Sequence, residues 1–375
     1  MAKKKITQLD LFSGIGGFHL GFEKAGFKVK SYFSEIDKHA IAVYKHQFKD
    51  AEYVGSVTNV RGSQLPRIDL ITFGSPCQDF SLAGKRAGLA GDRSGLILEA
   101  IRLIGECRPS VFIWENVKGS FSSNDGQDFA AILQEFTNLG GYRLEWQLLN
   151  TSWVLPQNRE RVYFVGYSTT PGGDWRGVFP IGEKPAGFNE GTRDATNVRA
   201  LVAGAKSGGR HSTMTLLKVK SATSRGYEIA EEGDSINLTA INSTTRRGRV
   251  GKAQAQTLDT SCAQAVVQPK IIGYTRDAKG KVTDRHLKDE AGTIQCSSGS
   301  GGNTDQYVQQ YRIRRLTPIE CERLQGFPDN HTEYGNYDGE VKKMSNTQRY
   351  KQCGNAVTVD VVKAVAEQLK PIYNA

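Results

Sequence analysis

The first 168 residues alternate between short apolar runs and segments in which apolar residues recur with helical spacing. Strands are predicted at residues 6–12, 29–34, 70–74, 111–115 and 161–167, and helices at residues 17–25, 38–48 and from Leu96 onward. Strands and helices in alternation predict an α/β fold with a mostly parallel, doubly wound sheet.

The pattern changes after residue 168. Residues 169–310 are rich in Gly, Ser, Thr and Gln, and three of their segments resemble one another (234–250, 255–267 and 291–308). The similarity indicates either a degenerate repeat that builds a small β-rich domain or a chance likeness between polar strands. We therefore expect residues 169–310 to form a separate domain.

Regular structure is predicted again toward the end of the chain. Thr317 is a candidate N-cap, Pro318 fits the first helical position, and Glu320 completes a capping box. A last helical pattern covers residues 357–369. We expect residues 311–375 to pack with residues 1–168 as one domain.

Composition narrows the class of protein. The 375 residues include 49 Lys and Arg against 39 Asp and Glu, a net charge of +10 that suits a polyanionic partner without proving one. The six cysteines are scattered with no C-x-x-C pair, which argues against a zinc site or a disulfide framework, and we expect no metal. No signal peptide or run of membrane-spanning length is present, so a soluble cytoplasmic protein is expected.

A cluster of glycines lies between the first predicted strand and helix. In DLFSGIGGF (10–18), Gly14, Gly16 and Gly17 would let the backbone approach a ligand closely. Glu35 follows the second strand, where a carboxylate can accept both hydroxyls of a ribose. The setting favours a nucleoside site over an ordinary tight turn, but G-I-G-G is not the G-x-G-x-x-G pattern of a dinucleotide site.

Four reactive or charged side chains are predicted at one edge of the sheet. Cys77, in GSPCQDFSLAG (74–84), follows a strand and the rigid Pro76. Glu115 ends the next strand, and Arg159 and Arg161 begin another, two residues apart and so on the same side. A lone cysteine is usually a small buried apolar residue, but these neighbours indicate a reaction site.

These motifs resemble the ordered motif set of the DNA (cytosine-5)-methyltransferases, bacterial or phage type. The resemblance covers residues 1–168 and 311–370 and includes DLFSGIGGF, GSPCQDFS, ENV, QNRERVYFVG, RRLTPIECERLQGFP and QCGNAVTV. It implies a Rossmann-like methyltransferase fold, S-adenosylmethionine as methyl donor, and a target-recognition domain at residues 169–310. The implied product is S-adenosylhomocysteine.

The resemblance also implies a role for each site residue. Cys77 would add to C6 of a cytosine flipped out of duplex DNA, and Glu115, protonated or sharing a proton, would bind N3 and the exocyclic amine. Arg159 and Arg161 would help to hold the base, with Arg161 the better match for its carbonyl. The expected donor-binding residues are Phe12, Gly14, Ile15, Gly16, Gly17, Glu35, Ile36, Ser56, Val57, Pro76, Leu96, Asn355 and Ala356.

Two of these positions depart from the family's common pattern. Ser56 stands where the family usually has an Asp that accepts the adenine amine, and Ile36 stands where an aromatic ring often stacks on the adenine. Both departures could weaken donor binding without touching the chemistry.

DNA contacts are expected from two stretches. The loop at residues 81–95 is a candidate lid that closes over the DNA, with a floppy surface loop as the alternative. The run TTRRGRVGK (244–252) is the candidate for base or phosphate contacts, with a solvated loop as the alternative. The expected DNA-binding residues are Gln78, Ser81, Lys85, Arg86, Arg246, Arg247, Arg249 and Lys252.

Three rival functions remain open. The tRNA-methylating branch of the same family shares the chemistry, although the long insert argues for DNA. A non-catalytic DNA-binding relative would not need the intact Cys77 and Glu115. A nicotinamide-dependent oxidoreductase would have no evident use for these two residues. We expect a monomer that acts on double-stranded DNA in a restriction-modification or phage DNA-protection setting, with a cognate restriction endonuclease as a candidate partner and no membrane partner.

Overall fold

The computed structural model describes residues 4–75, 95–168, 177–182, 217–239, 243, 245–276, 282–288 and 308–374. The chain divides into two compact units. Unit 1 comprises Met1–Pro185, Thr257–Cys262 and Thr317–Ala375, and unit 2 comprises Ala186–Gln256 and Ala263–Leu316. The sequence placed the domain boundaries at residues 168 and 311, and it did not separate Thr257–Cys262 from the insert around it.

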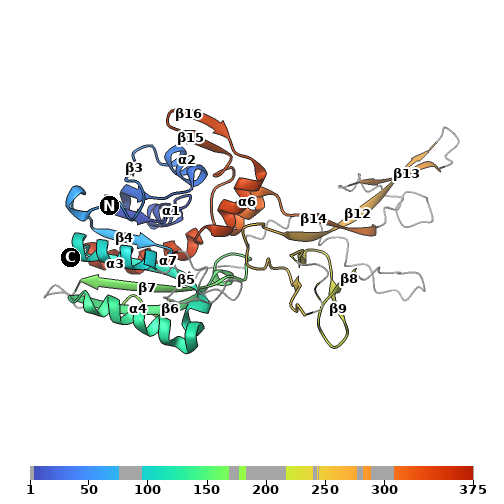
Figure 1. Cartoon of the computed structure of the whole chain (residues 1–375). Helices are drawn as coiled ribbons and strands as arrows, with labels where there is room; N and C mark the ends of the chain where they lie inside the picture. Colours follow the sequence, from blue (N-terminus) through green and yellow to red (C-terminus); the bar gives the residue numbers. More distant parts are fainter. Residues whose placement is uncertain are drawn as a thin grey trace. The chain divides into compact units, whose positions relative to one another are not determined.

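Unit 1 is built on a seven-stranded sheet with the strand order β3-β2-β1-β4-β5-β7-β6 (Figure 1). Its strands are β1 (Lys5–Leu11), β2 (Lys28–Ser34), β3 (Glu52–Tyr53), β4 (Leu70–Phe73), β5 (Val111–Val117), β6 (Tyr142–Asn150) and β7 (Glu160–Ser168). The five strands from β3 to β5 run parallel, while β7 is antiparallel to both β5 and β6. The predicted α/β, doubly wound, mostly parallel sheet is confirmed.

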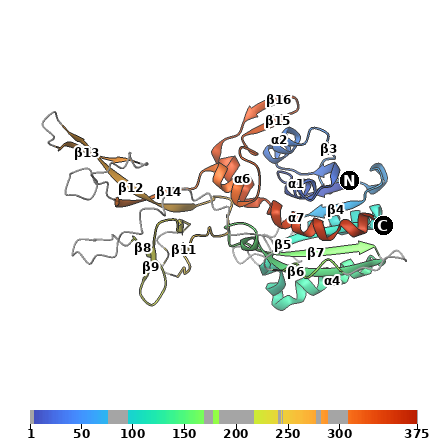
Figure 2. The same cartoon turned by 180° about the vertical axis from the view of Figure 1, so that it is seen from behind.

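Helices cover both faces of this sheet, as the two opposite views show (Figures 1 and 2). The helices of unit 1 are α1 (Gly17–Lys24), α2 (Lys38–Gln47), α3 (Gly95–Cys107), α4 (Gln127–Asn138), α5 (Pro318–Leu324), α6 (Asn346–Asn355), α7 (Val359–Gln368) and α8 (Lys370–Asn374). Short 3-10 helices lie at Gly62–Gln64, Lys118–Gly126 and Thr151–Trp153.

The strand residues divide between two apolar cores by simple alternation. On β5, Phe112 and Trp114 pack with residues of α3 and α4, whereas Val111 and Ile113 pack with residues of α1 and α7. Successive side chains of a strand point to opposite faces, so a strand buried on both sides must be apolar throughout. This explains why β4 and the first four residues of β5 are continuous apolar runs.

The C-terminal segment completes unit 1. Thr317 caps α5 and forms the predicted capping box with Glu320, and Pro318 occupies the first helical position. The antiparallel strands β15 (Tyr334–Tyr337) and β16 (Glu340–Lys343) follow, and β15 contacts α2. Thr317–Ala375 is grouped with Met1–Pro185 in unit 1.

Unit 2 contains only β-strands within the residues described. They are β8 (Leu217–Lys220), β9 (Tyr227–Ala230), β10 (Ser235–Asn237), β11 (Val250–Gly251), β12 (Gln264–Arg276), β13 (Val282–Lys288) and β14 (Val308–Arg315). β12 is the central strand and pairs antiparallel with β10, β13 and β14. Of the three similar segments, all of 291–308 except its last residue lies outside the described residues.

No helix in the described part of the chain is both long and apolar enough to cross a bilayer.

A buried polar network lies beneath the glycine loop of unit 1. Asp10, near the end of β1, is fully buried, and its carboxyl oxygens lie 2.7 Å from Thr72 Oγ1 and 3.2 Å from the Tyr44 hydroxyl oxygen, within hydrogen-bond distance of both. Burial raises the pKa of Asp10 to about 8; the two hydrogen bonds oppose this rise, and the charge of Glu35 adds to it. Asp10 is therefore protonated in the folded protein at neutral pH.

Asp10→Asn is expected to make folding stability less dependent on pH. The folded Asp10 carboxyl keeps its proton up to about pH 8, whereas the unfolded chain releases it near the ordinary pKa of 3.8. The free energy of unfolding should thus fall by about 1.4 kcal/mol per pH unit as pH rises through this window. Asparagine has no proton to lose, so urea unfolding between about pH 5.5 and 7.5 should give a shallower slope by that amount.

The matched control for this experiment is Asp50→Asn, at an exposed aspartate of the same unit. Its slope should equal that of the parent protein. An Asp10→Asn slope identical to the parent would mean that Asp10 is ionised in the fold.

Candidate functional site

The carboxyl ends of the parallel strands meet the start of β7 at one edge of the sheet. In the β5–β7 ladder, Glu115 pairs with Tyr163 and Val117 pairs with Arg161. Glu115 and Arg161 are therefore diagonal neighbours on the same face, within reach of each other's side chains. The antiparallel direction of β7 is what brings its first residues to this edge.

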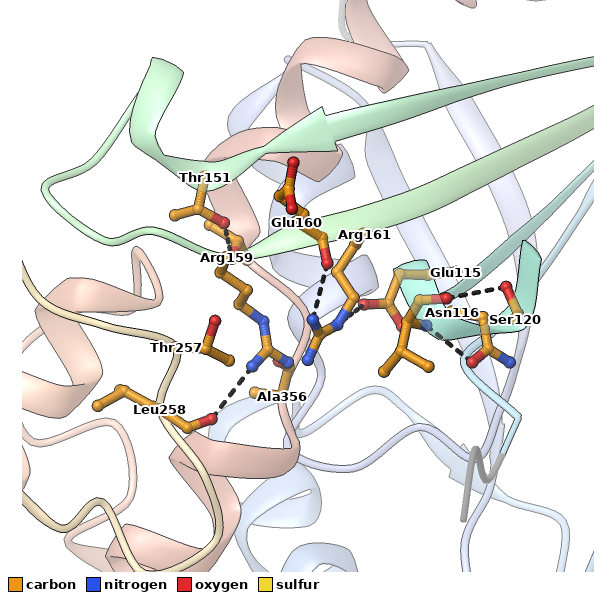
Figure 3. Close-up of polar contacts among 12 residues, drawn as sticks. Glu115, Asn116, Ser120, Thr151, Arg159, Glu160, Arg161, Thr257, Leu258 and Ala356 are labelled. Atoms are coloured by element: carbon orange, nitrogen blue, oxygen red, sulfur yellow. Dashed lines mark hydrogen bonds and ion pairs between the residues drawn. The ribbon is translucent and has the colours of Figure 1, made fainter. Parts of the chain in front are cut away.

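Glu115 and Arg161 form an ion pair at this edge (Figure 3). The Nε of Arg161 lies 3.2 Å from Oε1 of Glu115, and the two side chains are 17% and 10% exposed. Oε1 nevertheless accepts no hydrogen bond from the described residues, so the contact is electrostatic and leaves acceptor capacity for a ligand. A Cβ on Gly74 would lie 3.2 Å from Oε2 of Glu115, so the carboxylate lies beside the chain that leaves β4.

The chain that follows β4 is fixed to β5 just before the predicted nucleophile. Ser75 is buried, and its Oγ accepts hydrogen bonds from Trp114 Nε1 (3.1 Å) and Asn116 Nδ2 (3.3 Å). Pro76, Cys77, Gln78, Ser81, Lys85 and Arg86, together with the candidate lid up to residue 94, lie outside the described residues. Their roles stay predictions.

Arg159 has a different environment from Arg161. Arg159 is only 3% exposed, and its guanidinium donates to the carbonyl oxygens of Leu258 (3.3 Å), Gly354 (3.4 Å) and Ala356 (2.8 Å) (Figure 3). The structure thus separates two arginines that the sequence grouped together. Arg161 faces Glu115, and Arg159 holds backbone.

The glycine loop is tied to the residue predicted to hold a ribose. Oε2 of Glu35 accepts a hydrogen bond from the Gly14 N–H (2.9 Å), and Oε1 accepts from the N–H groups of Ile36 (2.7 Å) and Asp37 (3.0 Å). Gly14 has φ +54°, and a Cβ there would project into open space. A carboxylate has about four lone-pair sites, so Glu35 can still accept from a ligand.

The same loop is also held from the C-terminal segment, which the sequence did not predict. His331 is buried, and its Nε2 lies 2.9 Å from the carbonyl oxygen of Ile15. A carbonyl can only accept, so this nitrogen carries the hydrogen. Burial lowers the pKa of His331 to about 4, which keeps the ring neutral at physiological pH. A lone histidine more than 300 residues from the loop gave no sequence signal.

The remaining predicted donor-binding residues vary in exposure. Ile36 is 78% exposed, Asn355 is exposed, and Ile15, Gly16, Gly17, Val57 and Ala356 are buried. Phe12, Ser56 and Leu96 are half-buried, and Leu96 packs against the core beneath α3. Ser56 Oγ lies 3.1 Å from Thr58 Oγ1. The Oγ of Ser13 is buried and has no hydrogen-bond partner among the described residues.

In unit 2, the cations predicted to bind DNA are not equivalent. Arg246 and Arg247 are exposed, while Arg249 is only 2% exposed. Lys252 is exposed and pairs with Asp234 (2.7 Å) and Glu231 (3.3 Å). Arg246 and Arg247 are therefore better placed than Arg249 to meet a polyanion, and periodicity in such a loop could not have shown this.

Comparisons with known proteins agree with the fold and with the motifs. The chain is 32% identical to the type II methyltransferase M1.ScrFI of Lactococcus lactis subsp. cremoris, over 97% of this chain and 78% of that protein. It is 28% identical to the orphan methyltransferase M.SPRI of Bacillus phage SPR, over 98% of both chains.

Solved structures share the fold at lower identity. The Entamoeba histolytica methyltransferase EhMeth has a TM-score of 0.57 and 14% identity, covering 99% of both chains. An E. coli prophage protein described as a putative DNA modification methyltransferase has a TM-score of 0.53 and 18% identity, covering 99% of this chain and 100% of that one. The model of the C-5 cytosine-specific DNA methylase family matches residues 6–371, and the chain belongs to that family.

Proposed function

We propose that the protein transfers a methyl group from S-adenosylmethionine to C5 of a cytosine flipped out of duplex DNA, at a specific sequence, with Cys77 as the nucleophile. The observation that carries this proposal is the Glu115–Arg161 pair, which lies beside the chain that leaves β4 toward Cys77. A base inside a duplex cannot reach such a site, so it must leave the stack.

The chemistry requires a nucleophile because C5 of cytosine is unreactive by itself. Bond formation between the Cys77 sulfur and C6 breaks the C5–C6 π bond and, as N3 takes a proton, leaves a C4–C5 enamine in which C5 is nucleophilic. A cation beside the sulfur would favour the thiolate that this step needs, and Arg161 is the candidate for that role. Loss of the C5 proton to a base after methylation restores the double bond and expels Cys77.

Glu115 and Arg161 would orient and polarise the base. The free acceptor capacity of the Glu115 carboxyl suits a hydrogen bond from the exocyclic amine, a protonated oxygen of the same carboxyl would donate to N3, and the Arg161 guanidinium suits the base carbonyl. Their mutual contact fixes both side chains before the base arrives. Such preorganisation lowers the cost of reaching the transition state.

The residues of the glycine loop fit a nucleoside-containing methyl donor. Three features support this: remaining acceptor capacity on Glu35, open space above Gly14, and the buried, unpartnered Ser13 hydroxyl. The exposed side chain of Ile36 would offer an apolar surface to an adenine. S-adenosylmethionine bound there would supply an electrophilic methyl group.

Unit 2 is proposed as the target-recognition domain, and the exposed Arg246 and Arg247 are its candidate DNA contacts. Relatives named type II methyltransferases support a restriction-modification setting, and phage relatives named orphan methyltransferases support a DNA-protection setting. We further propose that the protein acts as a monomer inside the cell.

The methylated positions in DNA from cells that express the protein should identify its target sequence. A duplex with 5-fluorocytosine at that position should then trap a covalent protein–DNA adduct that withstands denaturation, because fluorine cannot leave C5 as a proton does. Methylation of tRNA instead of the duplex would favour the tRNA-methylating branch. DNA binding without methylation would favour a non-catalytic relative.

Cys77→Ser should abolish the adduct, and Glu115→Gln should lower the methylation rate about 10²- to 10⁴-fold, the usual contribution of a positioned acid or base. The rate is measured in single turnover with saturating DNA and donor. Glu160→Gln, on the same strand as Arg161 but paired with Lys118, is the matched control and should retain the parent rate. Adduct formation by Cys77→Ser would exclude Cys77 as the nucleophile.

His331→Phe should weaken binding of the product S-adenosylhomocysteine about fivefold, because the Ile15 carbonyl loses a hydrogen bond worth about 1 kcal/mol. His331→Gln keeps an N–H donor and should recover most of the affinity. Calorimetric titration at a temperature where both variants are folded measures this difference. Equal affinities for His331→Phe and the parent would show that the contact does not position the loop.

Arg246→Ala/Arg247→Ala should flatten the salt dependence of DNA binding. Each lost phosphate contact reduces the slope of log K against log salt by about 0.9, so a decrease of about 1.8 is expected. Lys342→Ala/Lys343→Ala removes two adjacent exposed cations of unit 1 and serves as the control for charge alone. An unchanged slope and an unchanged target sequence would rule these arginines out as DNA contacts.

A further inference from the structure

Arg159 contacts backbone from two separate parts of unit 1. Gly354 and Ala356 flank Asn355 at the C-terminal end of α6, and Leu258 belongs to Thr257–Cys262. The last carbonyls of a helix lack partners within the helix and carry its negative dipole end, so a guanidinium is well suited to bind them. These three acceptors, of Leu258, Gly354 and Ala356, are main-chain oxygens, and the Arg159 side chain is 3% exposed.

A second feature holds Thr257–Cys262 against α6 independently of Arg159. A Cβ on Gly354 would lie 2.1 Å from the carbonyl oxygen of Asp259, so only glycine permits this close approach of the two backbones. Further along, the thiol of Cys262 donates to the carbonyl of Tyr350 at 3.3 Å. The segment is therefore packed on α6 along most of its length.

The near end of the segment is held by the residue next to Arg159. The Thr257 hydroxyl donates to the carbonyl oxygen of Asn158 at 2.7 Å. The chain on both sides of Thr257–Cys262 belongs to unit 2, because Gln256 and Ala263 are its neighbours in sequence. Thr257–Cys262 is thus a short segment of unit 1 that connects the two stretches of unit 2, Ala186–Gln256 and Ala263–Leu316.

We propose that Arg159 is a positioning residue that fixes Thr257–Cys262 to the end of α6 and thereby sets how the proposed recognition domain meets DNA, without itself touching the target base. The proposal rests on the proposed function of unit 2. Arginine suits this task because its planar guanidinium can donate to three carbonyls at once. The ammonium group of a lysine, on a flexible side chain, is less suited to hold three acceptors in a fixed geometry.

The positioning role and a base-holding role predict opposite kinetics. A residue that holds the base acts on the bond-making step, so its loss lowers the single-turnover rate even at saturating DNA. A residue that fixes the recognition segment acts on how DNA binds, so its loss raises the KM for DNA and weakens discrimination between target sequences. The two roles can therefore be separated in one set of measurements.

The experiment compares Arg159→Met, Arg159→Lys and Gly354→Ala in the full-length protein. Arg159→Met should raise the KM for the target duplex about tenfold or more and lower its preference over a one-base-altered duplex by a similar factor, while the saturating single-turnover rate changes less than about threefold. Arg159→Lys should have a KM and a target preference between those of the parent and of Arg159→Met. Gly354→Ala should reproduce the pattern, because its Cβ displaces the same segment.

The double variant Arg159→Met/Gly354→Ala should have a KM for DNA and a target preference close to those of the more severe single variant, because both changes free the same segment, Thr257–Cys262. Arg323→Met is the matched control, because Arg323 is an exposed arginine of unit 1 that pairs with Asp329. It should match the parent in every measurement. A loss of about 100-fold in saturating rate with an unchanged KM for DNA would overturn the proposal, as would parent-like DNA binding by Gly354→Ala.

Hydrogen exchange tests, without relying on activity, whether Arg159 fixes Thr257–Cys262 to α6, a contact that we call the clamp. Amides of Thr257–Cys262 should exchange at least about tenfold faster in Arg159→Lys and Gly354→Ala than in the parent or in Arg323→Met. Unchanged exchange in both variants would refute the clamp. If exchange rises as expected while the parent protein methylates no DNA, the proposed function fails and the clamp stands.

Discussion

The shared direction of four neighbouring strands is the constraint on which the site depends. Because β1, β2, β4 and β5 are parallel, their carboxyl ends lie at one edge of the sheet, and the chain must leave all of them there. Each of these strand ends carries a part of the candidate site: the glycine loop, Glu35, the residues before Cys77, and Glu115. β7 adds Arg161 to the same edge because it runs in the opposite direction.

The sequence indicated β4 and the first part of β5 most directly, because these strands are buried on both faces and read as continuous apolar runs. It missed α4 and β6, which lie at or near the sheet edge, where polar residues interrupt the apolar pattern. The capping box at Thr317 was predicted because its residues are local in sequence. Local chemistry and continuous burial are the two signals that a single sequence carries well.

The candidate site could be predicted only in part, for a related reason. The positions of Glu115 and Arg161 follow from strand ends, so the residues could be grouped before the structure was known. The separate environments of Arg159 and His331 depend on contacts with segments up to 316 residues away, and Arg249 is buried although its neighbours Arg246 and Arg247 are exposed. No pattern within one stretch of sequence encodes such contacts.

The short return of the chain into unit 1 at Thr257–Cys262 has a consequence for protein engineering. The chain passes between the two units four times, at residues 185, 256, 262 and 316. A chimera that exchanges residues 186–316 as a single block would import a foreign segment onto α6 and Arg159 of the host. Exchanging two separate blocks and leaving the host's own six residues between them would preserve that contact, so graft boundaries in this fold should follow packing and not sequence continuity.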